Sequence, residues 1–238
     1  MLTQLEQHNA FAEGLLVQAA VTGSLERTQS VFDRGRLIAG HIYRQVVGGP
    51  GGGHVLKISV VSAPVREIAM RIGHALDWHG ALSFDYIRDD ATGTPHFIDA
   101  NPRLVEPMNA WLSGVDLPGA LLQVSLGETP PAQAPGREGV VTRLGLIGLL
   151  YAARQRNRRR DVLREIALLA SSAGRYRGSR EELVPLLTDP WCAVPLGVVV
   201  TRLLRNPAAA ARFSDTTIAA YSLTPQAIQR LRAWRHAA

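Results

Sequence analysis

A proline-rich segment divides this chain of 238 residues. Residues 129–136 contain Pro130, Pro131 and Pro135. Because proline fixes its φ angle and has no backbone N–H, three prolines this close together exclude both a regular helix and a central strand. The chain has room for one large domain or two small ones. We therefore predict a linker over residues 129–137, between a domain in residues 1–128 and a second domain in residues 138–238.

Composition excludes several classes of protein. Hydrophobic residues make up 46% of the chain and charged residues 19%, which is typical of a folded soluble protein and not of a disordered, collagen-like or coiled-coil chain. The longest apolar runs are shorter than the ~18 residues of a membrane helix. The first residues lack the features of a signal peptide, and the single cysteine, Cys192, excludes an internal disulfide and a cysteine-cluster metal site. We expect a cytoplasmic protein with Cys192 as a buried small residue.

The two parts of the chain differ in charge. Residues 1–128 carry a net charge of −4, and residues 129–238 carry +10. A run of arginines over residues 154–160 is basic enough to bind a phosphate backbone. The aromatic residues that would stack on bases are missing from this run, and arginine is also favourable near the C-terminal end of a helix. We therefore do not expect nucleic acid as a partner.

Residues 1–128 alternate strand and helix signals. A turn over residues 33–36 joins two apolar runs and predicts a hairpin. Pro64 suits a first helical turn, and apolar residues then recur at helical spacing until Gly80. The complete set of predicted elements is strands at 15–18, 30–32 and 37–43, a helix from 64 to 76, a hairpin of 82–88 with 95–101, and a helix at 116–126.

Residues 138–238 have helical patterns and no clear strand. Helices are predicted at 140–155, 160–173, 179–187 and 224–234, with Ser179 and Glu182 as a capping box for the third of them. Three aromatic residues, Trp191, Phe213 and Trp234, are interpreted as core residues. The fold class is therefore α+β, with an antiparallel sheet and helices in the first part, followed by a mainly helical C-terminal domain.

The second hairpin carries the candidate chemistry. A symmetric turn at Thr92 places Asp85 opposite Asp99, although a register shifted by one residue stays open. Like charges that are directly opposed on neighbouring strands are destabilising, so a partner should compensate for them. Side chains alternate along a strand, so Asp99, Asn101 and Arg103 project to one side if the strand continues. Two carboxylates and an amide oxygen suit Mg²⁺ that also binds substrate phosphates, and Arg103 is suited to a phosphate oxygen.

A hairpin whose acids only keep it soluble is the alternative interpretation of these residues. Asp99 lies in the sequence Phe97-Ile98-Asp99-Ala100-Asn101. Its apolar neighbours predict that the carboxylate is buried, and an isolated buried carboxylate is costly. This expectation favours a functional site over a solvated hairpin.

These segments resemble the C-terminal lobe of the ATP-grasp superfamily. The resemblance rests on residues 80–87, 95–103, 113–118 and 126–128, and the superfamily includes biotin carboxylase, carbamoyl phosphate synthetase and D-alanine ligase. It implies that Asp85, Asp99 and Asn101 hold Mg²⁺ on ATP, with Mn²⁺ as an alternative ion. It also implies that Arg103 is a catalytic residue beside the reacting phosphate. The family usually has glutamate at the position of Asp99.

The resemblance extends upstream to the nucleotide. Residues 15–26 resemble the hinge segment whose backbone meets adenine, which implies that Gln18 lies at the hinge and Glu26 near the ribose. Lys57, which follows a run of three glycines at 51–53, resembles a basic residue that faces phosphate. A surface loop with a solvated lysine is an equally good interpretation of that segment.

The resemblance covers residues 14–128, which correspond to the back half of an ATP-grasp domain. It implies an ATP-dependent carboxylate ligase, in which a carboxylate forms an acyl phosphate that an amine or another nucleophile captures. We expect the chain to be a fragment or a shortened form without the N-terminal lobe, working as a homo-oligomer or with a complementing subunit. The alternative is a non-catalytic interaction protein whose basic helical domain docks a partner.

Overall fold

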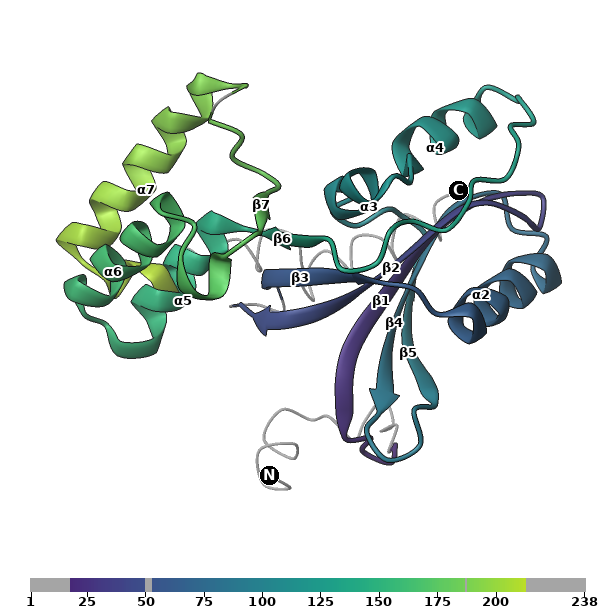
Figure 1. The fold of residues 1–238 in the computed structure, drawn as a ribbon, viewed down its shortest axis with the longest axis horizontal. Coiled ribbons are helices and arrows are strands. Elements are labelled where there is room, and N and C mark those ends of the chain that lie inside the picture. Colours follow the sequence, from purple (N-terminus) through teal and green to yellow (C-terminus); the bar gives the residue numbers. More distant parts are fainter. Residues whose placement is uncertain (1–17, 50–52, 187, 213–238) are drawn as a thin grey trace, which may run out of the picture.

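A computed structural model describes residues 18–49, 53–186 and 188–212. A single mixed sheet forms the centre of this part of the molecule, with the strand order β5-β4-β1-β2-β3-β6-β7 (Figure 1). All neighbouring strands are antiparallel except β6 and β7. The strands are β1 (Gly23–Asp33), β2 (Arg36–Gly48), β3 (His54–Val60), β4 (Gly80–Asp89), β5 (Pro95–Asn101), β6 (Val141–Arg143) and β7 (Arg180–Glu181).

Helices pack on both faces of the sheet and at one end of it. The α-helices are α2 (Ala63–Ala75), α3 (Met108–Ser113), α4 (Leu117–Ser125), α5 (Gly145–Arg156), α6 (Arg159–Ala170) and α7 (Ala193–Arg205), and short 3₁₀ turns lie at η2 (Gly174–Tyr176) and η3 (Pro190–Cys192). None of the helices in the described ranges is both long and apolar enough to pass through a bilayer. The α+β class is confirmed by this arrangement.

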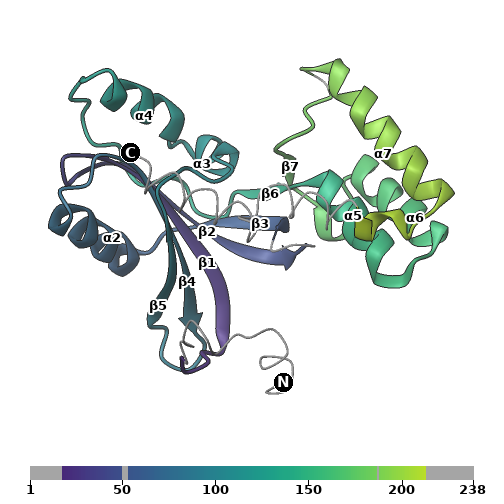
Figure 2. The same cartoon turned by 180° about the vertical axis from the view of Figure 1, so that it is seen from behind.

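Alternation along β1 explains why both faces are covered. Phe32 packs with residues of α2, whereas its neighbour Val31 packs with residues of α3 and α4. Successive side chains of a strand point to opposite faces, so α2 and the pair α3 and α4 lie on opposite sides of the sheet (Figure 1). Seen from behind, α5, α6 and α7 gather at the end of the sheet where β3, β6 and β7 lie (Figure 2).

Both predicted hairpins and the predicted amphipathic helix are confirmed. β1 and β2 meet at the turn before Arg36, and β4 pairs with β5. Helix α2 buries Val65, Ala69 and Gly73, and Pro64 lies in its first turn. The helix was predicted to reach Leu76 but ends at Ala75, and Leu76 is 59% exposed. The helix predicted at 116–126 is α4, with Asp116 as its N-cap.

The expectation that residues 138–238 contain no strand was wrong. β6 pairs with β3, and β7 pairs with β6, so the sheet continues into the C-terminal part. The helix predicted from residue 140 therefore begins at Gly145. The proline-rich segment is irregular, as predicted, and Gln133 donates its backbone N–H to Ile38 O at 2.7 Å. The division of the chain into two domains stays a prediction.

The helix predicted at 179–187 was also wrong. Ser179 donates its hydroxyl to the carbonyl of Tyr176, and Glu182 is buried against Lys57, so neither forms a capping box. Helix α7 was missed, because valines and Pro195 make its sequence a poor helix signal. Trp191 is 81% exposed and Cys192 is partly exposed, so neither is a core residue.

Three further predictions fall outside the described residues. They are the strand predicted at 15–18, of which only Gln18 is described, the helix at 224–234, and the core positions of Phe213 and Trp234.

Candidate functional site

One face of the sheet carries a row of polar residues across four neighbouring strands. Arg27 in β1 is opposite Tyr43 in β2 on one side and opposite Asp85 in β4 on the other. Asp85 is in turn opposite Asp99 in β5. Because opposed residues of paired strands project to the same face, these four side chains share one surface. Their face is the one opposite α2.

The predicted register of the hairpin is confirmed at Asp85 and Asp99, and a bulge follows directly. The pairing Asp85 with Asp99 gives way to Tyr86 with Phe97, which leaves Ile98 as an extra residue. Ile98 is 53% exposed. The bulge therefore separates the polar end of β5 from its aromatic end, where Phe97 packs against Tyr86 and Phe84.

Arg27 supplies the compensation that the opposed carboxylates require. Its Nε lies 2.8 Å from Oδ2 of Asp85, and both side chains are less than 20% exposed. Burial lowers the pKa of Arg27, but the neighbouring Tyr43 and Asp85 outweigh it, so the pKa is raised overall. Arg27 thus remains charged and holds Asp85 in place. The sequence analysis missed Arg27. Residues 26–30 are all polar, so this part of β1 has no alternation of polar and apolar residues that would mark Arg27.

Asp99 and Asn101 lie together at the outer edge of the sheet. Asn101 Nδ2 donates a hydrogen bond of 2.7 Å to Asp99 Oδ2. Asp99 is exposed, so the expectation of a buried carboxylate was wrong. The reason is that β5 is the edge strand of the sheet. In the described part of the chain, Asp99 forms no ion pair.

Arg103 follows the end of β5 and is placed by its backbone. Its N–H donates to Asn101 O at 2.8 Å, and Ser83 Oγ donates to its carbonyl at 2.5 Å. β5 ends at Asn101. The alternation that places Asp99 and Asn101 on one side therefore does not extend to Arg103, whose side chain is exposed.

Gln18 and Glu26 lie away from this row. Gln18 is exposed in the segment before β1. Glu26 is 1% exposed and receives two hydrogen bonds from Arg88, from Nε at 3.1 Å and from Nη2 at 2.9 Å, together with one from the hydroxyl of Tyr86. Since Glu26 directly precedes Arg27, it projects to the opposite face of the sheet.

Lys57 is buried, which excludes the interpretation as a solvated loop lysine. The residue is 1% exposed. Its Nζ lies 2.9 Å from Glu182 Oε2 and 3.0 Å from Glu106 Oε2, and it sits 4.7 Å from the ring centroid of Tyr43. Burial raises the pKa of Glu182, and Lys57 opposes this effect. Lys57 therefore joins β3 to the loop before α3 and to the segment after β7.

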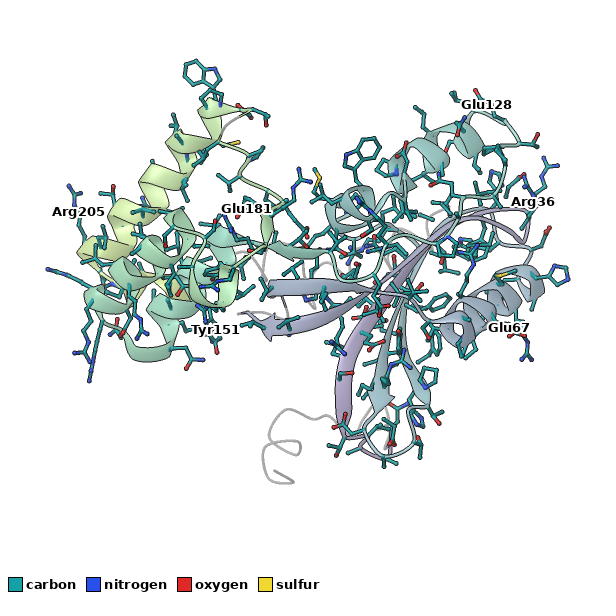
Figure 3. All side chains as sticks on the ribbon, in the orientation of Figure 1. Arg36, Glu67, Glu128, Tyr151, Glu181 and Arg205 are labelled. Carbon is teal, nitrogen blue, oxygen red and sulfur yellow. The ribbon has the colours of Figure 1, made fainter. Side chains whose placement is uncertain are left out.

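A cleft of about 800 Å³ lies on the far side of Glu182. It runs between α3, β6 and the helices α5 to α7, and its walls are mainly apolar. The side-chain view shows Glu181 between the helical end and the sheet (Figure 3). Glu182 lines this cleft and pairs with Lys57, which in turn contacts Tyr43 of the polar row.

Two buried histidines complete the polar face. His54 bonds to Arg27 and to Gln45, the latter at 3.0 Å, and His41 donates from Nε2 to Asn109 Oδ1 at 2.8 Å. Burial, with the charges of Arg27 and Lys57, lowers the pKa of His54 to about 3. Burial lowers the pKa of His41 to about 4 against the opposing hydrogen bond to Asn109. Both side chains are neutral in the folded protein near pH 7.

We expect the folded state to lose stability between about pH 7 and pH 5. The folded pKa of each histidine is depressed, so the unfolded chain binds more protons below about pH 6.5, and the stabilisation present above that pH is lost as the pH falls. The loss should be on the order of 2 kcal/mol per histidine at about pH 5, and it should grow further until the pH reaches the folded pKa. Urea unfolding of the parent and of His41→Gln across this range measures it.

The matched control is His96→Gln, because His96 is an exposed histidine of the same sheet. The unfolding free energy of His41→Gln should have a shallower pH slope than that of either the parent or His96→Gln. If the unfolding free energy of all three proteins had the same pH slope, His41 would not contribute to the pH dependence as predicted.

Comparisons with known proteins give partial matches. No protein-family model matches the chain. Acetyl-CoA carboxylase 2 of Oryza sativa subsp. japonica is 35% identical over 65 residues, and that of Arabidopsis thaliana is 34% identical over 65 residues. Each match covers 26% of this chain and 3% of the relative. The chain therefore spans a small part of the curated relatives that it matches.

Several solved structures also match part of this chain, at low sequence identity. Rhizobium etli pyruvate carboxylase T882A matches with 21% identity and a TM-score of 0.41, over 58% of this chain and 16% of that one. The Campylobacter jejuni biotin carboxylase-beta-gamma-ATP complex matches with 20% identity and a TM-score of 0.44, over 52% and 30%. L-amino acid ligase from Bacillus licheniformis matches with 16% identity and a TM-score of 0.42, over 54% and 36%. These three matches cover 52 to 58% of this chain.

Proposed function

We propose that the polar face of the sheet binds Mg-ATP as part of an ATP-dependent carboxylate ligase. The observation that carries the proposal is the juxtaposition of Asp85 and Asp99, which are directly opposed on neighbouring strands with Asn101 bonded to Asp99. The sequence identity with acetyl-CoA carboxylase 2 over 65 residues supports the same type of chemistry.

The donor set fits a magnesium ion that also binds phosphates. Because Asn101 directs its Nδ2 to Asp99, its Oδ1 is available as a ligand. Within the described ranges, no group of three His, Cys, Asp or Glu side chains forms a cage for a metal. That agrees with Mg²⁺, which usually takes one or two carboxylates and completes its shell with substrate phosphates and water. Mn²⁺ would use the same oxygen atoms.

The residues of the chain would act mainly by positioning and by neutralising charge. Asp85, Asp99 and Asn101 would hold the metal, which neutralises phosphate charge when bound. Arg27 fixes the direction of Asp85 through its ion pair. Arg103, exposed beside Asn101, would stabilise the transferring phosphoryl group, and Gln18 remains a proposed nucleotide contact. Glu26 does not fit that role, because it is buried on the opposite face and bonded to Arg88 and Tyr86. Such effects account for most of the catalysis in phosphoryl transfer.

We propose a carboxylate, ATP and an amine or another nucleophile as the substrates. A carboxylate would attack the γ-phosphate to give an acyl phosphate and ADP, and an amine or another nucleophile would then displace phosphate. The row at Asp99 is exposed, so a second lobe, from this protein or from a complementing subunit, would cover the nucleotide. The single Cys192 agrees with a reducing cytoplasmic compartment, which is where we place the activity.

Mg-ATP should stabilise the folded chain, and the loss of Asp99 should remove this effect. A ligand at 100 times its Kd stabilises by ~2.7 kcal/mol, which thermal unfolding with and without Mg-ATP detects. Asp99→Asn keeps the shape of the side chain, and Asp99 is exposed, so the variant should fold like the parent and lose most of the shift. Asp85→Ala should lose it as well, together with some stability from Arg27.

The matched control is Asp90→Asn, an exposed acid in the turn of the same hairpin. This variant should keep the full shift. Equal shifts for the parent and Asp99→Asn would contradict the proposed metal site.

A second function is favoured by an apolar stripe on the surface. Trp191, Val194 and Val198 are 81%, 60% and 54% exposed, and their spacing places them on one side of η3 and α7. An exposed stripe of this kind fits a non-catalytic interaction protein whose helical part docks a partner. No Mg-ATP shift in a folded parent would favour this second function over the ligase.

A further inference from the structure

A small cavity lies between α2 and the sheet, on the face opposite Asp85 and Asp99. It has a volume of about 110 Å³. Thr28 and Ser30 form its floor, Arg66 and the first residues of α2 form one side, and Leu37 and Ile42 add apolar wall. Because Thr28 directly follows Arg27, the cavity is separated from the polar row by the thickness of the sheet.

The electrostatic surroundings of the cavity favour an anion. Helix α2 has 13 residues, and its N-terminal end lines the cavity at Ser62 and Ala63. The first N–H groups of a helix have no partner within the helix, and this end carries partial positive charge. Ser62 makes no side-chain cap, and the first turn contains no acidic residue. The feature that usually neutralises a helix N-terminus is therefore missing at α2.

Arg66 adds a full positive charge at the same place. It is half-buried beside Gly40, and in the described ranges it has no carboxylate partner. Among the described residues that line the cavity, none is Asp or Glu. An arginine in the first turn of a helix opposes the dipole, so its position is unfavourable unless an anion lies nearby.

Ser30 is an independent indication of a ligand. The residue is 1% exposed and lines the cavity, and its hydroxyl has no hydrogen-bond partner among the described residues. A buried hydroxyl without a partner costs free energy, so such groups usually have one. A ligand that accepts a hydrogen bond from Ser30 Oγ would satisfy it.

The size and walls of the cavity narrow the class of anion. At ~30 Å³ per water molecule, a volume of about 110 Å³ has room for roughly three or four groups of that size. The apolar side chains of Leu37, Ile42 and Val60 line it together with the polar groups. We propose that the cavity is a binding site for a short-chain monocarboxylate, with its carboxylate held by Arg66, Ser30 and the N-terminus of α2 and its alkyl group against the apolar wall.

Three conditions at equal ionic strength test the proposal. They are sodium propionate, propionamide with added sodium chloride, and sodium chloride alone. Thermal unfolding of the full chain should show saturable stabilisation by propionate, and no more than the salt effect with the neutral isostere propionamide. Formate should stabilise less than propionate, because it lacks the alkyl group. An equal response to propionate, propionamide and salt would overturn the proposal.

Variants then locate the site. Arg66→Gln should weaken propionate binding about tenfold or more, as expected for the loss of a charged hydrogen bond, and Ser30→Ala should weaken it severalfold. Arg71→Gln is the matched control, since Arg71 is an exposed arginine of the same helix that does not line the cavity. It should bind within twofold of the parent. Unchanged binding by Arg66→Gln, or equal weakening by Arg71→Gln, would contradict the site.

The result is separable from the proposed function. Asp99→Asn should bind propionate like the parent, because Asp99 lies on the other face of the sheet. Arg66→Gln should likewise keep its Mg-ATP shift.

Discussion

Replacing Lys57 with methionine should lower the free energy of unfolding by about 3 to 5 kcal/mol, which is the usual cost of breaking a buried ion pair on one side. The ammonium group lies within 3.0 Å of both Glu106 and Glu182. The side chain of Glu182 is completely buried, so Lys57→Met would leave its charge without a partner. Urea unfolding of both proteins measures the difference.

The double variant Lys57→Met with Glu182→Met should recover most of this loss. Replacing both members of a buried pair by apolar residues is often neutral, whereas removing one is costly. Arg44→Met is the control, because Arg44 is an exposed cation in the neighbouring strand β2, and it should change stability by less than about 0.5 kcal/mol. If Lys57→Met lowered the free energy of unfolding by less than about 1 kcal/mol, Lys57 would not be what holds these segments together.

Gly73→Ala should destabilise the protein by about 1 to 3 kcal/mol, the usual cost of overpacking a core. A Cβ atom at Gly73 would lie 2.1 Å from Cε1 of Phe32, whose side chain is fully buried. Neither α2 nor the ring can move without disturbing the packing between that helix and the sheet. Chemical unfolding of the variant gives the cost.

A second glycine provides the matched control for this substitution. Gly197 lies inside α7, and an added Cβ there would have no atom within 4 Å among the described residues outside the adjacent backbone of the helix. Gly197→Ala should therefore stabilise by about 0.5 to 1 kcal/mol, since alanine is the better helix former. Phe32→Leu in the Gly73→Ala background should recover part of the loss. If the two glycine variants changed stability alike, the contact with Phe32 would not be the cause.

Local patterns in the sequence were sufficient for the elements around the candidate site. The hairpin of β4 and β5 has its predicted register at Asp85 and Asp99, because a short turn fixes which residues of the adjoining strands face each other. The amphipathic repeat after Pro64 predicted α2 for a similar reason, since side chains at helical spacing share one face.

Contacts between distant segments were not predictable in this way. The pairing of β6 with β3 joins Thr142 to Lys57, and strands this short have no periodicity of their own. The burial of Lys57 and the failure of the predicted helix at 179–187 have one cause, because Glu182 packs against Lys57 from another part of the chain. A local signal such as the pair Ser179 and Glu182 cannot report that competition.

The sequence by itself determined which residues of the hairpin meet, namely Asp85, Asp99 and Asn101, since hydrogen bonding and side-chain alternation along neighbouring strands are local properties. Only the tertiary structure decided their environment. Arg27 compensates Asp85 because β1 lies beside β4, and Asp99 is exposed because β5 is the edge of the sheet. Burial and charge pairing depend on the order of the strands and on which helices cover them, and these follow from the packing of the whole chain.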